Sequence, residues 1–131
     1  MKRRLALVAG ACVLSVAAYA HHSFPATYLM EEEMTIEGVL VAFMYRNPHS
    51  MIHLRTTDEN GQTRRWSIEW GGASFLSGQG ITRTTFKPGD YVVVTGHPGR
   101  NPEDYRAHMM RIERLSDGLV WPAPGQTTIF D

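Results

Sequence analysis

Polar and apolar residues alternate along much of this chain, with the period of two that places successive side chains on opposite faces of a β-strand. Runs of this kind, rich in β-branched and aromatic residues, lie at 34–45, 50–57, 62–70, 91–95 and 105–115. In the third run, Trp66, Ile68 and Trp70 share one face. The pattern therefore predicts five β-strands.

Turn-forming residues separate the predicted strands. Pro48 ends the first, because proline cannot donate to a strand ladder and restricts the residue before it. Gly61 lies in a hairpin-like turn after the second strand, and Gly89 follows a proline just before the fourth. Between the third and fourth strands, 73–79 has room for only one short helix. The first three strands are therefore expected to form a meander.

Three strands, a short helix and two more strands follow the element order of the OB-fold, a small, partly open Greek-key barrel. We therefore predict an all-β fold, an OB-fold-like barrel of five strands over 34–116 with one short helix between strands three and four. A β-sandwich is the alternative. An extended lead-in at 21–33 is expected before the barrel, and a weakly structured tail at 117–131 after it.

The segment 1–20 has the pattern of a cleaved secretory signal peptide. Three basic residues precede an uncharged apolar run, and alanines at positions 18 and 20 favour cleavage before His21. The run is shorter than the roughly 20 apolar residues of a membrane-spanning helix, so we expect no integral membrane span in the mature chain. Lipidation at Cys12 is the alternative, but Ala9 stands where a lipoprotein signal usually has leucine. We expect a soluble periplasmic or secreted protein.

Cleavage would change the composition of the chain. Three of the 13 basic residues precede His21, which leaves 10 against 13 acidic residues. The single cysteine, Cys12, is also lost, so the mature domain must be held together by its core alone. The remaining 111 of 131 residues suffice for one such core and are too few for two ordinary domains. A mildly acidic exported chain also lacks the basic face that nucleic acid requires.

Several motifs resemble those of a family of small exported bacterial proteins of unknown function. The motifs are spread over most of the mature chain: His21-His22-Ser23-Phe24, Asn47-Pro48-His49, Gly61, Trp66, Glu69, Lys87-Pro88-Gly89-Asp90 and Val94-Thr95-Gly96. The resemblance implies export and a small β-barrel-like domain. It implies no particular activity, so the residues themselves must carry the functional argument.

His21 and His22 would form the mature N-terminus. A terminal histidine offers one ion both its imidazole and its α-amine, whose reference pKa of about 7.7–8.0 makes the neutral form accessible near neutral pH. Nitrogen-rich sites favour Cu(II) among the common divalent metals. The alternative is a pair of exposed polar residues at a frayed end.

A second candidate cluster follows Pro48. Alternate strand residues share a face, so Met51 and His53 should project together, and His49 joins them if the strand starts early. Imidazoles with a methionine suit copper, and Cu(I) in particular. The ligand types resemble those of periplasmic OB-fold copper and silver chaperones. Alternatively, this segment is a turn whose polar side chains hydrogen-bond the backbone, and His53 is an ordinary surface residue.

Three further residues complete the candidates. Glu69 can act as a metal ligand or as a partner that orients a histidine, although a solvent-facing position is the simplest expectation. His97 and His108 each stand apart from the other histidines in the sequence, and we expect them to be structural.

Two functions of different classes remain once enzymes are set aside, because the chain has no nucleophile elbow and no phosphate loop. The first is an exported metal-binding protein that binds or handles a copper ion, with a metal-transport or other periplasmic protein as partner. Its candidate ligands are His21, His22, His49, His53, Met51 and Glu69. The second is a non-enzymatic periplasmic barrel that binds a partner or small ligand, with structural histidines.

Overall fold

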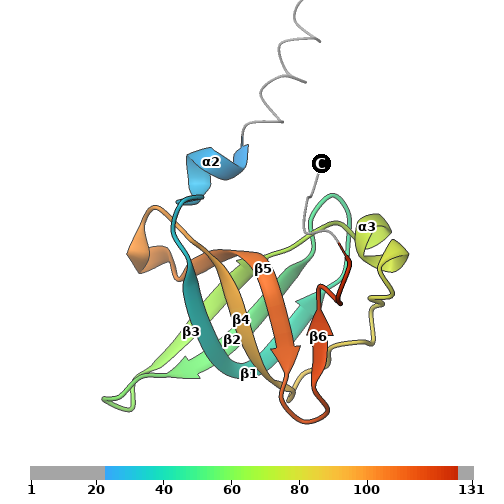
Figure 1. Ribbon diagram of the computed structural model, residues 1–131. Coiled ribbons are helices and arrows are strands. Elements are labelled where there is room, and N and C mark those ends of the chain that lie inside the picture. Colours follow the sequence, from blue (N-terminus) through green and yellow to red (C-terminus); the bar gives the residue numbers. More distant parts are fainter. Residues whose placement is uncertain (1–22, 127–131) are drawn as a thin grey trace, which may run out of the picture.

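The computed structural model describes residues 23–126 and has the predicted order of strands (Figure 1). The expected signal peptide, its cleavage site and the pair His21 and His22 lie outside the described residues. The elements are α2 (Ser23–Thr27), β1 (Met34–Met44), β2 (Met51–Thr57), β3 (Thr63–Glu69), α3 (Ala73–Gly78), β4 (Tyr91–Pro98), η1 (Pro102–Asp104), β5 (Arg106–Arg114) and β6 (Leu119–Trp121). No described helix is long and apolar enough to cross a membrane.

Five of the strands close into a barrel. β1 pairs with β2, β2 with β3, β1 with β4 and β4 with β5, all antiparallel. A short parallel contact between β3 and β5 completes the circuit. With α3 between β3 and β4, this is the arrangement predicted for an OB-fold-like barrel, and the β-sandwich alternative is wrong.

The strands bend where side chains are absent or the ladder is irregular. A Cβ atom on Gly38 would collide with the backbone carbonyl of Arg55 on β2, and one on Gly96 with that of His108 on β5. β1 also shifts its register with β2 between Leu40 and Ala42. These close approaches allow β1 and β4 to coil around the core, because glycine lets one backbone lie directly against another.

Trp70 lies at the centre of the core. Its ring centroid is 4.9 Å from that of Trp121, 5.8 Å from Phe43 and 6.0 Å from Phe86. Trp70 and Ile68 are fully buried, as their shared face predicted, whereas Trp66 is only partly buried and packs edge-on against a loop tyrosine. Since the core draws one face from each strand, alternate residues of the strands remain on the outer surface.

Both ends of the described chain are more ordered than the sequence pattern predicted. Residues 23–27 form the short helix α2 rather than an extended lead-in, and the segment expected to be a weak tail contains β6. β6 pairs with β5 through Ile112 and Trp121, and the Trp121 side chain is 1% exposed. Because β6 has only three residues, its sequence shows no alternation of polar and apolar positions, and only its packing reveals it.

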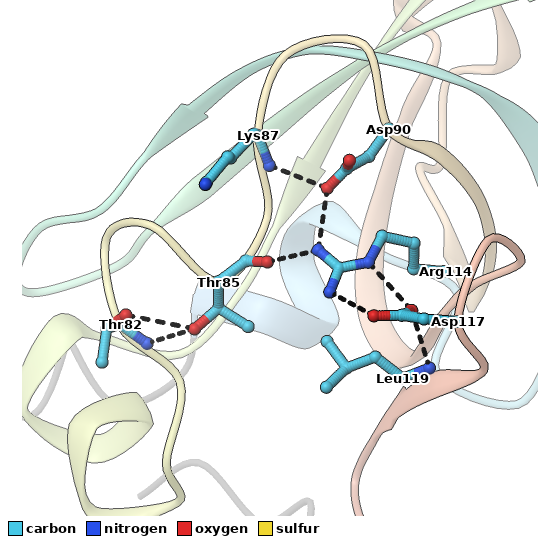
Figure 2. A network of polar contacts seen from close by, with 7 residues as sticks. All are labelled: Thr82, Thr85, Lys87, Asp90, Arg114, Asp117 and Leu119. Carbon is cyan, nitrogen blue, oxygen red and sulfur yellow. Dashed lines mark hydrogen bonds and ion pairs between the residues drawn. The ribbon is translucent and has the colours of Figure 1, made fainter.

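A polar network closes the barrel at the end away from α2 (Figures 1 and 2). The Arg114 guanidinium donates to the Thr85 carbonyl at 2.5 Å, to Asp90 at 3.0 Å and to Asp117 at 2.8 and 3.0 Å. The hydrogen bond from Arg114 lowers the pKa of Asp117 to about 2. Arg114 thereby joins the loop before β4 to the turn between β5 and β6.

Candidate functional site

Glu69, the last residue of β3, is a shared acceptor for side chains from three other parts of the chain. Its Oε1 lies 2.7 Å from Nδ1 of His49, and its Oε2 accepts a hydrogen bond from the Tyr28 hydroxyl. Nη2 of Arg106 lies 3.7 Å from Oε2. The Glu69 side chain is only 16% exposed. The expectation of a solvent-facing Glu69 is therefore wrong, and the alternative role, a partner that orients a histidine, describes its contacts.

Closure of the barrel explains how these groups meet. In the parallel contact, Glu69 lies beside His108, and Ser67 lies beside Arg106. In the antiparallel ladder with β2, Glu69 is opposite Met51, which brings it next to the segment that carries His49. No pairwise pattern in the sequence predicts this meeting, because it depends on β3 and β5 becoming neighbours.

Tyr28 ties the N-terminal segment to the same place. Its side chain is fully buried, and Arg106 lies over its ring at 5.7 Å and donates to its hydroxyl at 3.3 Å. The backbone N–H of Tyr28 donates to the carbonyl of Phe24 in α2 at 2.8 Å. The N–H of the next residue, Leu29, donates to the carbonyl of Pro98 at the end of β4 at 2.9 Å. Burial and the Glu69 carboxylate raise the pKa of Tyr28 well above its usual value, so its hydroxyl is a proton donor.

The contact with Glu69 selects one tautomer of His49. A carboxylate can only accept, so the proton of a neutral His49 ring lies on Nδ1 and the lone pair on Nε2. The His49 side chain is 37% exposed. Histidines that bind metals are commonly held in this way, with the second nitrogen donating to a carboxylate.

The turn that presents His49 is anchored to α3. The Asn47 side chain accepts from the backbone N–H of Ser74 at 3.1 Å, which caps the first turn of that helix. A Cβ atom on Gly72 would collide with the Pro48 carbonyl and with Asn47. The prediction of a turn whose polar side chains bond the backbone is confirmed for Asn47. The same turn places His49 against Glu69, so the two interpretations of the motif are compatible.

Two histidine rings pack against Phe24 of α2, and a third histidine stacks on one of them. The Phe24 ring centroid lies 5.0 Å from that of His49 and 4.4 Å from that of His108. His97 stacks on His108 at 6.1 Å with the ring planes 11° apart. The strand register brings His97 and His108 opposite one another on β4 and β5. These two histidines are 11 positions apart in the chain, and no local sequence pattern brings them together, because their meeting depends on that register.

His108 and His97 are held in different ways. His108 is 6% exposed, and its burial lowers its pKa to about 4, although the nearby Glu69 acts in the opposite direction. His108 is therefore neutral at pH 7. The His97 ring is held by the segment that precedes β1, because its Nδ1 donates to the backbone carbonyl of Glu32. This bond leaves Nε2 of His97 unprotonated when the ring is neutral.

His53 belongs to a different environment. It shares the outer face of β2 with Met51, as predicted, and its Nδ1 hydrogen-bonds Ser67 at 3.1 Å. Burial lowers the His53 pKa, and Arg65 and Arg46 add to the effect. Within 23–126, no group of three or more histidine, cysteine or acidic side chains has the geometry of a metal site. The candidates His21 and His22 lie outside that range.

Comparison with known proteins places the chain in a family. No curated protein matches it. A family model matches residues 9–107, which is most of the chain and includes α2, the turn that carries His49, Glu69 and Arg106. The chain therefore belongs to DUF6152, a family of unknown function.

Proposed function

We propose that this protein is an exported metal-binding protein that binds or handles copper through His49 and the mature N-terminal residues His21 and His22. The contact that carries the proposal is the 2.7 Å hydrogen bond between His49 Nδ1 and Glu69. It orients the ring and leaves Nε2, on a half-exposed side chain, as the atom that can bind an ion.

The position of Phe24 supports a site shared between His49 and the N-terminus. The Phe24 ring packs against both His49 and His108. His22 precedes Phe24 by only two positions, and the covalent geometry of the backbone limits how far apart two such residues can lie. With cleavage before His21, the proposed site adds the α-amine and the imidazoles of His21 and His22 to the imidazole of His49.

The chemistry of these donors favours copper. An amine and imidazoles provide the nitrogen ligands that Cu(II) prefers, and Met51, opposite Glu69 on the ladder, adds a thioether suited to Cu(I). Glu69 acts through His49 in this proposal, because both of its oxygens already accept from protein donors. His53 is a weaker candidate, because Arg46 and Arg65 disfavour a cation beside it.

The biological setting completes the proposal. The signal-like segment before His21 supports a periplasmic or secreted location, where the chain would deliver copper to a metal-transport or other periplasmic protein. The ligand types are similar to those of periplasmic OB-fold copper and silver chaperones. We propose binding and transfer of the ion without catalysis.

The test is a copper titration of metal-free protein that begins at His21. Cu(II) is followed by EPR, where nitrogen couplings count the bound imidazoles and amine, and Cu(I) by competition with a chromophoric chelator. His49→Ala is compared with His53→Ala, a matched substitution in β2, the strand that follows the turn of His49. A form with one glycine before His21 keeps both imidazoles and moves the terminal amine away.

The proposal expects one tightly bound copper ion. His49→Ala and the added glycine should each weaken binding by at least about tenfold, the equivalent of one lost good interaction, while His53→Ala changes little. Copper binding no tighter than that of a short histidine peptide, unaltered by either change, would refute the proposal.

A barrel that binds a partner protein or small ligand is the second candidate function. The described residues include three exposed large apolar side chains, Val41, Tyr91 and Leu115. Tyr91 and Leu115 are neighbours, since the Leu115 N–H donates to the Tyr91 carbonyl at 3.2 Å. Such side chains favour contact with another molecule, and this candidate remains if copper fails to bind.

A further inference from the structure

We propose that the outer face of β1, β4 and β5 is an interface between two copies of this chain, which associate as a weak two-fold homodimer. The inference goes beyond the second candidate function, because it names a second copy as the molecule that the exposed apolar side chains contact. It does not depend on copper binding.

The strand register gathers the exposed apolar side chains on one face. Val39 of β1 is opposite Tyr91 of β4, and the N–H of Leu115, just after β5, donates to the Tyr91 carbonyl at 3.2 Å. Val41 continues the outward face of β1. The exposed fractions of Val41, Tyr91 and Leu115 are 37%, 44% and 52%. Four apolar side chains from three strands therefore adjoin on the outer surface.

Charged residues of opposite sign border this apolar face. On the β2 side, Arg55 is the ladder partner of Val39, and Arg65 of β3 is the next residue across; both arginines are exposed. On the β5 side, Glu113 is opposite Val93 of β4 and is partly exposed. The face thus has a basic flank on β2 and β3 and an acidic flank on β5.

The charges of the two flanks are only partly neutralised within one copy. Among residues 23–126, neither Arg55 nor Arg65 makes an ion pair with an acidic side chain, although Glu37 lies diagonal to Arg55 on β1. Like charges opposite one another destabilise a sheet. Glu113 pairs with Arg111 at 2.9 Å, but solvent screens such a surface pair. An acidic group from outside would therefore stabilise the basic flank.

The order of the strands makes the face complementary to itself. Across this part of the barrel the order is β2, β1, β4 and β5, so β1 and β4 lie in the middle. A two-fold axis that runs between them, along the strands, sets β1 of one copy against β4 of the other and β2 against β5. The apolar centres then cover one another, and each basic flank faces an acidic flank. Two-fold contacts of this self-complementary kind are the commonest in homo-oligomers.

The small size of the apolar centre indicates a weak dimer. Interfaces that bury less than about 1,200 Å² in total are typical of transient contacts, and four apolar side chains on each copy suit that class. We expect a dissociation constant of about 1–100 μM. A lipid surface or a small ligand would cover the apolar centre but would leave one of the two charged flanks without a complement.

The test is sedimentation velocity of the protein that begins at His21, free of metal, over a concentration series that spans this range. Leu115→Ser reduces the apolar centre, whereas Arg55→Glu and Glu113→Arg each place like charges across the interface. Each change should weaken the dimer by at least about tenfold. All three positions are at least partly exposed, and thermal unfolding checks that each variant is folded.

Mixing the two charge variants gives the sharpest result. In a pair formed by one Arg55→Glu copy and one Glu113→Arg copy, one flank contact is native and the other has its charges exchanged. The mixture should therefore associate about as tightly as the parent, although neither variant does so alone. The matched control is Arg83→Glu, at an exposed position in the loop after α3, which should dimerise as the parent does.

Four outcomes would overturn the inference. A parent protein that stays monomeric throughout the series would leave the apolar side chains to a different molecule. A dimer that is unchanged by Leu115→Ser would have its contact elsewhere, and equal weakening by Arg83→Glu would indicate nonspecific association. Charge variants that fail to associate when mixed would exclude the two-fold arrangement. Because copper is absent, none of these results bears on the copper proposal.

Discussion

Nδ1 of His49 lies 2.7 Å from Oε1 of Glu69, although the residues are 20 positions apart and on opposite sides of a hairpin. The bond joins the turn before β2 to the end of β3. Through the other Glu69 oxygen it also connects to Tyr28 and the N-terminal segment. One carboxylate thus links the three parts of the chain that the proposed copper site needs.

Glu69→Gln should weaken copper binding without removing a ligand. The amide can turn its NH₂ toward Nδ1, which reverses the preferred tautomer of His49 and takes the lone pair away from Nε2. Loss of such a partner typically costs roughly 10- to 100-fold in metal affinity. Chelator competition measures the change, with Glu113→Gln on β5 as the control. Equal affinities in all three proteins would contradict an orienting role for Glu69.

Tyr28→Phe should destabilise the fold by about 1.5–3 kcal/mol, the range for a hydrogen bond to a charged group, and urea unfolding measures it. The folded-state pKa of Tyr28 is raised above 10.0 by burial and by Glu69. Its contribution is therefore complete below pH 10 and declines as the pH rises above it. The phenylalanine variant should lose that part of the alkaline dependence, and a parallel decline in both proteins would contradict this assignment.

Acid should destabilise the protein through His108. Its pKa falls from 6.5 in an exposed ring to about 4 in the fold, mainly through burial. The unfolded chain binds the proton more readily, so stability decreases as the pH falls from 6.5 toward 4, by about 2 kcal/mol at pH 4.5. Urea unfolding at pH 7 and 4.5 measures this, and His108→Gln should flatten the difference. An unchanged pH dependence in the variant would exclude His108 as its source.

Asn47→Ala should separate the structural role of its motif from the proposed copper site. The substitution removes the acceptor for the Ser74 N–H and should cost about 1 kcal/mol, as for other helix caps. Thermal unfolding measures the loss. Copper affinity should stay close to that of the parent if the His49–Glu69 bond holds the imidazole in place. A large loss of affinity would show that the turn itself positions His49.

Arg114→Lys should destabilise the barrel although the charge is kept. Lysine cannot donate to Asp90, Asp117 and the Thr85 carbonyl at once with the planar fork that Arg114 uses (Figure 2). We expect a loss of about 1 kcal/mol, since solvent screens the exposed part of the network. The urea midpoint measures it, and copper affinity is the internal control. An unchanged midpoint would show that the network adds little.

The amino-acid sequence by itself determined the strands of the barrel and the short helix between β3 and β4. Long runs with a period of two, ended by proline and glycine, leave few other ways to bury one face of each strand. The same local signals failed where an element is short: α2 and β6 are visible only through the packing of Phe24 and Trp121. For the candidate site, the sequence correctly singled out Asn47, His49 and Glu69 as worth attention.

Only the tertiary structure decided how these residues are used. Glu69 was expected to face solvent, because side chains alternate along β3 and its two neighbours in the chain point into the core. The β3–β5 contact and Tyr28 nevertheless cover Glu69. The meeting of His97 with His108, and of Arg55 with Arg65, likewise follows from strand register. Alternation within a strand assigns a side chain to a face, whereas its neighbours on that face come from distant strands. Their identity is settled when the barrel closes.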